Sequence, residues 1–127
     1  MDSQRRMKVV LCDDDASVRQ VMGTLAEEAG FEVVGQAALA LEALVLCEML
    51  KPHALILDLA LMGISGVDII VSIKTAAPET EIIVYTAFDN MGTLAERKGV
   101  FAVVRKDEPG KLEVALRQLR TSSRAMI

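Results

Sequence analysis

Three carboxylates, one hydroxyl and one ammonium group follow apolar, strand-like runs of this sequence. One run leads into Asp13 and Asp14 and another into Asp58, and two later runs lead to Thr86 and Lys106. If the strands lie parallel in one sheet, their carboxyl ends share an edge, where ligand sites of open α/β sheets form. A cluster of this kind could bind a divalent cation and handle a phosphoryl group.

Alternating apolar runs and helical patterns would position these residues. Helices are expected at about 38–51, 67–76, 90–98 and 109–120, after a first helix that Asp15 or Ser17 can cap and Gly30 ends. The expected strands are 7–12, 33–34, 54–57, 82–85 and 101–104. This alternation predicts βαβ units and a parallel sheet with right-handed crossovers, but it leaves the strand order open.

The composition indicates one globular domain. The chain has 127 residues, of which 52% are hydrophobic and 25% charged, so a single core is expected, at about 7–121, within one domain over 1–127 with flexible ends. The net charge of −4 without a basic stripe argues against direct nucleic-acid binding. The arginines near the end, Arg117, Arg120 and Arg124, are interpreted as a solvated face.

No targeting or membrane signal stands out. The start is short and polar, and the longest apolar stretch, 37–50, is interrupted by two glutamates and is too short to span a bilayer. A cytosolic protein is therefore expected. Cys12 and Cys47 lack metal-binding spacing and are predicted to be small buried side chains in a reducing compartment, while His53 is expected to have a loop or strand-entry role.

Several motifs in order resemble the response-regulator receiver domain, the CheY-like module of two-component signalling. These are Asp13-Asp14, Arg19, Asp58, Gly66, Thr86-Ala87 and Lys106. The resemblance runs from about Lys8 to Leu119 and implies a flavodoxin-like, doubly wound (βα)5 fold with five parallel strands in the order 2-1-3-4-5. The segments 77–80 and 106–107 are most similar to receivers of helix-turn-helix transcription factors.

The resemblance also implies roles for the site residues. Asp58 would accept a phosphoryl group from a sensor histidine kinase, a phosphotransfer protein or a small donor, without turnover of a separate substrate. Thr86 would donate to a phosphoryl oxygen, and Lys106 would pair first with Asp58 and then with that group. The implied Mg²⁺ ligands are Asp13 or Asp14, Asp58 and the carbonyl of Ala60. Three carboxylates and one lysine carry a formal charge of about −2 at neutral pH, which one divalent cation balances.

The sequence departs from the family at positions that concern output. Met62 stands where the family usually has proline, and Val103 stands where many relatives carry an aromatic switch residue. Asp107 replaces a common proline, so a trans peptide bond is expected before it. Only 19 residues separate Thr86 from Lys106, which leaves a short helix between them.

Other functions stay open at this point. The same fold could serve as an interaction module that signals without phosphate, and less well as a metal-dependent hydrolase or a cofactor-binding protein. The helix at 38–51 has more apolar positions than one sheet face can cover, so either neighbouring helices bury them or a partner does. An output domain, a partner protein and a dimer are all compatible with the sequence.

Overall fold

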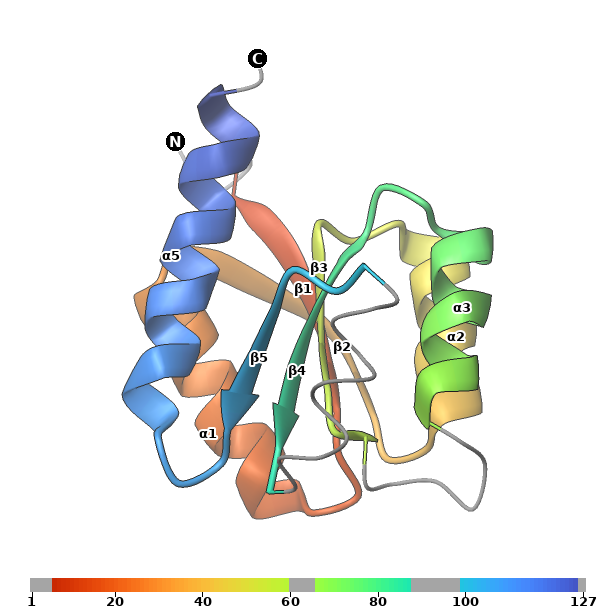
Figure 1. Ribbon diagram of the computed structural model, residues 1–127, viewed down its shortest axis with the longest axis horizontal. Helices are drawn as coiled ribbons and strands as arrows, with labels where there is room; N and C mark the ends of the chain where they lie inside the picture. The colour runs from red at the N-terminus through yellow and green to blue at the C-terminus, as the bar shows by residue number, and fades with distance from the viewer. Residues whose placement is uncertain (1–5, 60–65, 88–98, 126–127) are drawn as a thin grey trace.

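The computed structural model of the chain describes residues 6–59, 66–87 and 99–125. Figure 1 shows its strands, which are β1 (Met7–Cys12), β2 (Phe31–Ala37), β3 (Ala54–Leu57), β4 (Glu81–Thr86) and β5 (Ala102–Arg105). The helices are α1 (Ala16–Glu28), α2 (Ala40–Leu50), α3 (Gly66–Ala76) and α5 (Pro109–Ala125). All strand pairs are parallel, and the five-stranded sheet has the order β2-β1-β3-β4-β5. The predicted fold class and strand order are confirmed.

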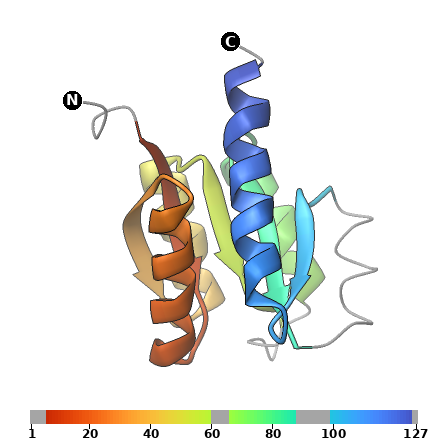
Figure 2. The ribbon, with the colours of Figure 1, turned by 90° about the vertical axis from the view of Figure 1, so that its left-hand side faces the viewer.

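Helices cover both faces of the sheet. Figure 2 shows α1 and α5 in front of the sheet and α2 and α3 behind it. The alternating residues of β3 are divided between the two cores, with Ala54 and Ile56 packed on the α1/α5 side and Leu55 and Leu57 on the α2/α3 side. Because both faces of β3 are buried, every position of the strand is apolar.

The strand registers align the ends of the central strands. Cys12 of β1 lies beside Leu57 of β3, Leu57 lies beside Val84 of β4, and Thr86 lies beside Arg105 of β5. The residues that follow these positions therefore gather at the carboxyl edge of the sheet, as the alternation of strands and helices predicts.

Several boundaries differ from the sequence-based expectation. β2 is longer than 33–34 because pairing with β1 extends it, with an irregularity opposite Val9 and Val10. α2 spans only Ala40–Leu50 and is shorter than the expected 38–51, because Lys51, which follows it, has a left-handed φ of 48° that stops the helix. α5 continues beyond residue 120, and the expected helix at 90–98 lies outside the described residues.

The ends of α1 are held by identifiable contacts. Asp15 caps the helix, since its Oδ1 accepts a hydrogen bond from the main-chain nitrogen of Ser17 at 2.9 Å. Gly30 follows the helix with a φ of 92°, which favours glycine. Arg117 and Arg120 of α5 donate to the carbonyls of Glu28 and Ala29 at 2.7 and 3.1 Å. Arg117 is exposed, as the interpretation of a solvated face expected, and Arg120 is partly buried. Both also satisfy carbonyls at the end of α1, a contact that the sequence did not predict.

Three smaller predictions are also tested by the fold. Cys12 and Cys47 are buried free thiols, as expected. His53 lies at the entry to β3, as expected, and contacts Lys8 of β1. Its main-chain nitrogen donates to the Lys8 carbonyl and its Nδ1 accepts from the Lys8 nitrogen, both at 2.9 Å. Within the described ranges, no helix is long and apolar enough to cross a membrane.

Candidate functional site

Asp13 is held rigidly at the end of β1. It is fully buried, and its main-chain nitrogen donates to the Ala37 carbonyl at 3.1 Å. Its Oδ1 accepts from the nitrogen of Asp15 at 2.9 Å, and its carbonyl accepts from Nη1 of Arg19 at 2.6 Å. Strand pairing and Arg19 of α1 therefore fix the main chain of Asp13, and the nitrogen of Asp15 orients its carboxylate.

Asp58 directly follows β3 and is also buried. Its main-chain nitrogen donates to the carbonyl of Cys12 at 3.1 Å, which continues the pairing of β3 with β1. The two carboxylates therefore emerge from neighbouring strands at the same height in the sheet.

Lys106 joins these two carboxylates. Its Nζ lies 2.7 Å from Oδ2 of Asp13 and 2.9 Å from Oδ2 of Asp58. The contact with Asp58 has hydrogen-bond geometry, whereas the Oδ2 of Asp13 is buried without a hydrogen-bond donor among the described residues. The short distance to Asp13 is therefore an ion pair that is poorly directed as a hydrogen bond.

The environment of Lys106 keeps it charged. Burial by itself lowers the pKa of this ammonium group, but the contacts with Asp13 and Asp58 outweigh burial, so its pKa lies above the ordinary value. By formal charge, one lysine faces two buried aspartates, and one negative charge is left over. The same site affects the neighbouring thiol, since burial first and Asp13 second raise the pKa of Cys12 to about 12.

Thr86 ends β4 and is buried beside residues 105–107, which we call the lysine segment. Its carbonyl accepts from the main-chain nitrogen of Lys106 at 2.9 Å. Tyr85, which sequence reasoning did not single out, donates its hydroxyl to the carbonyl of Lys106 at 3.4 Å. The signal in the sequence was the lone tyrosine of the chain, placed in an otherwise aliphatic strand directly before Thr86.

Of the remaining predicted site residues, only Asp14 lies in the described part of the chain. Asp14 is exposed, and no group of three His, Cys, Asp or Glu side chains arranged for a metal occurs among the described residues. Ala60 and Met62 lie outside the described ranges. The structure therefore brings Asp13, Asp58, Thr86 and Lys106 to one edge, without Asp14 in a three-carboxylate group.

The backbone and the neighbouring side chains of the lysine segment are also defined. None of the described peptide bonds is cis, so the expected trans bond before Asp107 is confirmed. Arg105 and Asp107 form an exposed ion pair at 2.8 Å. Val103 is partly buried and packs against the core on the α2/α3 side.

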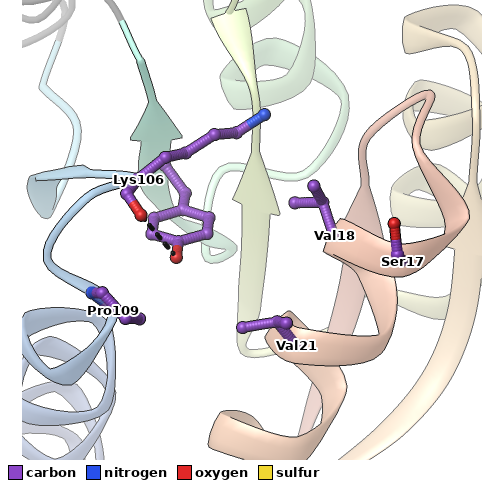
Figure 3. A pocket seen from close by; sticks show the side chains of 6 residues that line it. Ser17, Val18, Val21, Lys106 and Pro109 are labelled. Carbon is purple, nitrogen blue, oxygen red and sulfur yellow. Dashed lines mark hydrogen bonds between the residues drawn. The ribbon is translucent and has the colours of Figure 1, made fainter.

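A pocket lies beside the main chain of Lys106. It has a volume of about 300 Å³ and is lined by Ser17, Val18, Val21, Tyr85, Lys106 and Pro109. Figure 3 shows Val18 and Val21 of α1 on one side and Pro109, at the start of α5, on the other. The Lys106 side chain extends away from Pro109, so the pocket adjoins the site through the backbone of the lysine.

Fold and site together define a receiver domain. The family model of the response regulator receiver domain matches residues 9–117, and the chain belongs to this family. It is therefore homologous to the receiver domains of two-component regulators.

Individual relatives agree with this assignment. The chain is 36% identical over 110 residues to the uncharacterized transcriptional regulatory protein YhcZ of Bacillus subtilis, covering 84% of this chain and 51% of that protein. It is 28% identical to the chemotaxis protein CheY of Thermotoga maritima, covering 88% of this chain and 96% of CheY. It thus spans about half of one relative and nearly all of the other.

A solved structure is also similar. A two-component response regulator of the LuxR family from Aurantimonas sp. SI85-9A1 superimposes with a TM-score of 0.83 at 26% identity, covering 92% of this chain and 86% of that one. The resemblance to receivers of transcriptional regulators is thereby confirmed.

Proposed function

We propose that this chain is a phosphoryl-accepting receiver domain, with its functional unit at about 7–121, in which Asp58 accepts the phosphoryl group. The single observation that carries the proposal is the position of Lys106, whose Nζ lies within hydrogen-bond distance of Asp58 and in ion-pair contact with Asp13. An ammonium group next to a buried nucleophilic carboxylate can neutralise the oxygens of an incoming phosphoryl group.

A Mg²⁺ ion fits the donor set of this site. Carboxylate oxygens are hard ligands of the kind that Mg²⁺ prefers. The buried carboxylates of Asp13 and Asp58, which Lys106 contacts in this structure, would hold the ion. Asp14 would contribute through water, since it is exposed, and the carbonyl of Ala60 is the further proposed ligand. When bound, Mg²⁺ supplies charge neutralisation between the attacking carboxylate and the phosphoryl oxygens.

The protein's own residues position the reaction. A carboxylate oxygen of Asp58 attacks the phosphorus atom, and the bond to the donor's leaving atom breaks with its electron pair leaving on the donor. Lys106 then pairs with a phosphoryl oxygen, and the hydroxyl of Thr86 donates to another. The hydrogen bond between the Lys106 nitrogen and the Thr86 carbonyl supports joint movement of these two residues.

The donor would be a sensor histidine kinase or a phosphotransfer protein, as for two-component receivers in general. The new charge would shift the packing around β4 and β5 and so change binding to a partner or an output domain. Since the relatives include both a protein of similar length and one about twice as long, either arrangement of output is compatible with the chain. No turnover of a separate substrate is proposed.

The deciding experiment is intact mass after incubation with acetyl phosphate and Mg²⁺. The wild-type chain should gain one phosphoryl group, and the Asp58→Asn variant should gain none. A chain that binds Mg²⁺ but gains no phosphoryl group would overturn the proposal and leave the second candidate, a receiver-like module that signals without phosphate. The partly buried Val103 at the usual aromatic switch position is the observation that favours this candidate.

A further inference from the structure

The outer face of α2 is apolar and exposed. Almost every residue of Ala40–Leu50 is apolar, yet only Ala40, Ala43 and Cys47 are buried. A helix with apolar residues on all sides is normally buried on all sides. This helix lies against the sheet on one side only (Figure 1).

Three exposed side chains form one stripe along this helix. Leu41, Val45 and Met49 are 62%, 51% and 72% exposed. Because they are four residues apart, they lie one above another on the same face of the helix. We call these three residues the α2 stripe. The neighbouring α3 does not cover it, so of the two alternatives that the sequence left open, burial by neighbouring helices does not hold for these three positions.

The flanks of the α2 stripe are acidic. Glu42 and Glu48 lie three positions before and after Val45, so the helical rotation of about 100° per residue puts one on each side of the stripe. Both glutamates are exposed. Glu42 also accepts hydrogen bonds from the nitrogens of Ala38 and Leu39 at 3.2 Å, which fixes its position at the start of the helix.

Two described lysines at the C-terminal ends of α2 and α3 are engaged by other groups. α2 itself contains no lysine or arginine. Lys51, which follows it, donates from Nζ to the carbonyl of Ala76 at 2.6 Å. Lys74 of α3 donates to the carbonyl of Thr80 at 2.9 Å and pairs with Glu81 at 3.3 Å. The surface around the α2 stripe therefore combines an apolar centre with two exposed carboxylates that form no ion pair with a described lysine or arginine.

We propose that the α2 stripe is a docking surface for an amphipathic helix of a protein partner, with apolar residues along its centre and lysine or arginine on its flanks. Helix-in-groove and helix-on-helix recognition uses apolar anchors spaced at i and i+4, which matches the stripe. Flanking cations would meet Glu42 and Glu48 and select the partner by charge. A second copy of this face, or an anionic lipid surface, would bring further negative charge against the same glutamates.

The test uses the whole chain and two model peptides. One peptide is a helix-forming sequence with leucine on one face and lysine on its flanks, and the other has glutamate in place of lysine. Titration is followed by ¹⁵N–¹H chemical shifts. The lysine peptide should shift resonances of α2, and binding should weaken as salt increases.

Matched variants decide where the peptide binds. Val45→Glu and Met49→Glu should each weaken binding of the lysine peptide about tenfold or more, as expected for a central anchor. Val114→Glu on α5 is the control, because Val114 is 53% exposed and Val45 51%. Thermal unfolding should show that all three variants fold.

Four results of the peptide titration would overturn the proposal, and so would either of two further results. The four are equal binding of the glutamate peptide, shifts that lie away from α2, equal weakening by Val114→Glu, and absence of binding at millimolar peptide. Sedimentation that detects a dimer dissociated by Val45→Glu would assign the stripe to a second copy, and binding of the chain to phosphatidylserine vesicles through the stripe would assign it to lipid. The result does not depend on phosphorylation of Asp58.

Discussion

The hydroxyl of Tyr85 donates to the main-chain carbonyl of Lys106 across 3.4 Å. The next residue of the strand, Thr86, accepts a hydrogen bond at its carbonyl from the main-chain nitrogen of the same lysine. Two successive residues of β4 therefore hold the lysine segment. Burial raises the pKa of the Tyr85 hydroxyl, so it stays protonated and can donate at neutral pH. Tyr85 packs in the α1/α5 core, while the lysine side chain reaches Asp13 and Asp58 on the other side of its backbone.

Removing this hydroxyl should affect the reaction more than the fold. Tyr85→Phe keeps the ring in the core and loses a hydrogen bond that is long, so the free energy of unfolding should fall by only about 0.5 kcal/mol. We expect the rate of phosphorylation by acetyl phosphate to fall roughly threefold, which corresponds to about 0.6 kcal/mol in the barrier. Intact mass against time measures this rate. An unchanged rate would mean that Tyr85 does not position Lys106.

Lys106 should stabilise the two carboxylates that it contacts. Lys106→Met keeps most of the aliphatic stem and removes the charge, which leaves Asp13 and Asp58 facing each other while buried. Because the lysine side chain is 24% exposed, we expect a loss of roughly 1–3 kcal/mol, below the cost for a fully buried pair.

Urea unfolding at neutral pH checks this expectation. Added Mg²⁺ should recover more stability in Lys106→Met than in the wild type, since the cation replaces the missing charge. A variant as stable as the wild type without Mg²⁺ would show that the lysine is not needed to compensate these carboxylates.

Asp13 should determine Mg²⁺ binding. A ligand that binds only the folded state at a hundred times its Kd stabilises it by about 2.7 kcal/mol. The unfolding temperature of the wild type should therefore rise with Mg²⁺, and this rise should be absent in Asp13→Asn. The matched control is Asp107→Asn, which alters an exposed aspartate paired with Arg105 in the same region and should keep the rise. Equal rises in both variants would exclude Asp13 as a ligand.

His53 should make stability depend on pH. Burial first and the charge of Lys8 second lower the pKa of His53, and its Nδ1 must be unprotonated to accept from the nitrogen of Lys8. The unfolded chain therefore binds a proton more readily than the folded one. This contribution to stability is present above the ordinary histidine pKa of about 6.5 and is lost as the pH falls through the lower folded value.

A variant isolates this effect because His53 is the single histidine of the chain. Urea unfolding between pH 7.5 and 5.5, a range chosen around the ordinary histidine pKa of about 6.5, should show declining stability in the wild type. His53→Gln should show a smaller slope over the same range. Identical slopes would assign the pH dependence to carboxylates.

The sequence by itself determined the architecture and most of the site. An all-apolar β3, alternating helices and polar residues after four strands are local patterns, and parallel strands of one sheet necessarily end at a common edge. The pattern left the strand order open, and the family resemblance supplied it. Asp13, Asp58, Thr86 and Lys106 could therefore be named without coordinates.

Tertiary structure decided how these residues pair. Whether Lys106 reaches one carboxylate or two depends on the twist of the sheet and on the turn that begins at Lys106, and neither leaves a periodic signal. Arg117 and Arg120 contact α1, and Tyr85 contacts Lys106, so each contact joins residues far apart in the chain. From the sequence, the two arginines could therefore be described only as surface charges and the tyrosine only as part of an apolar strand. The sequence did not determine the exposure of the α2 stripe either. The apolar arc of a helix shows which side chains could be buried, but the placement of the neighbouring helices decides which of them are buried.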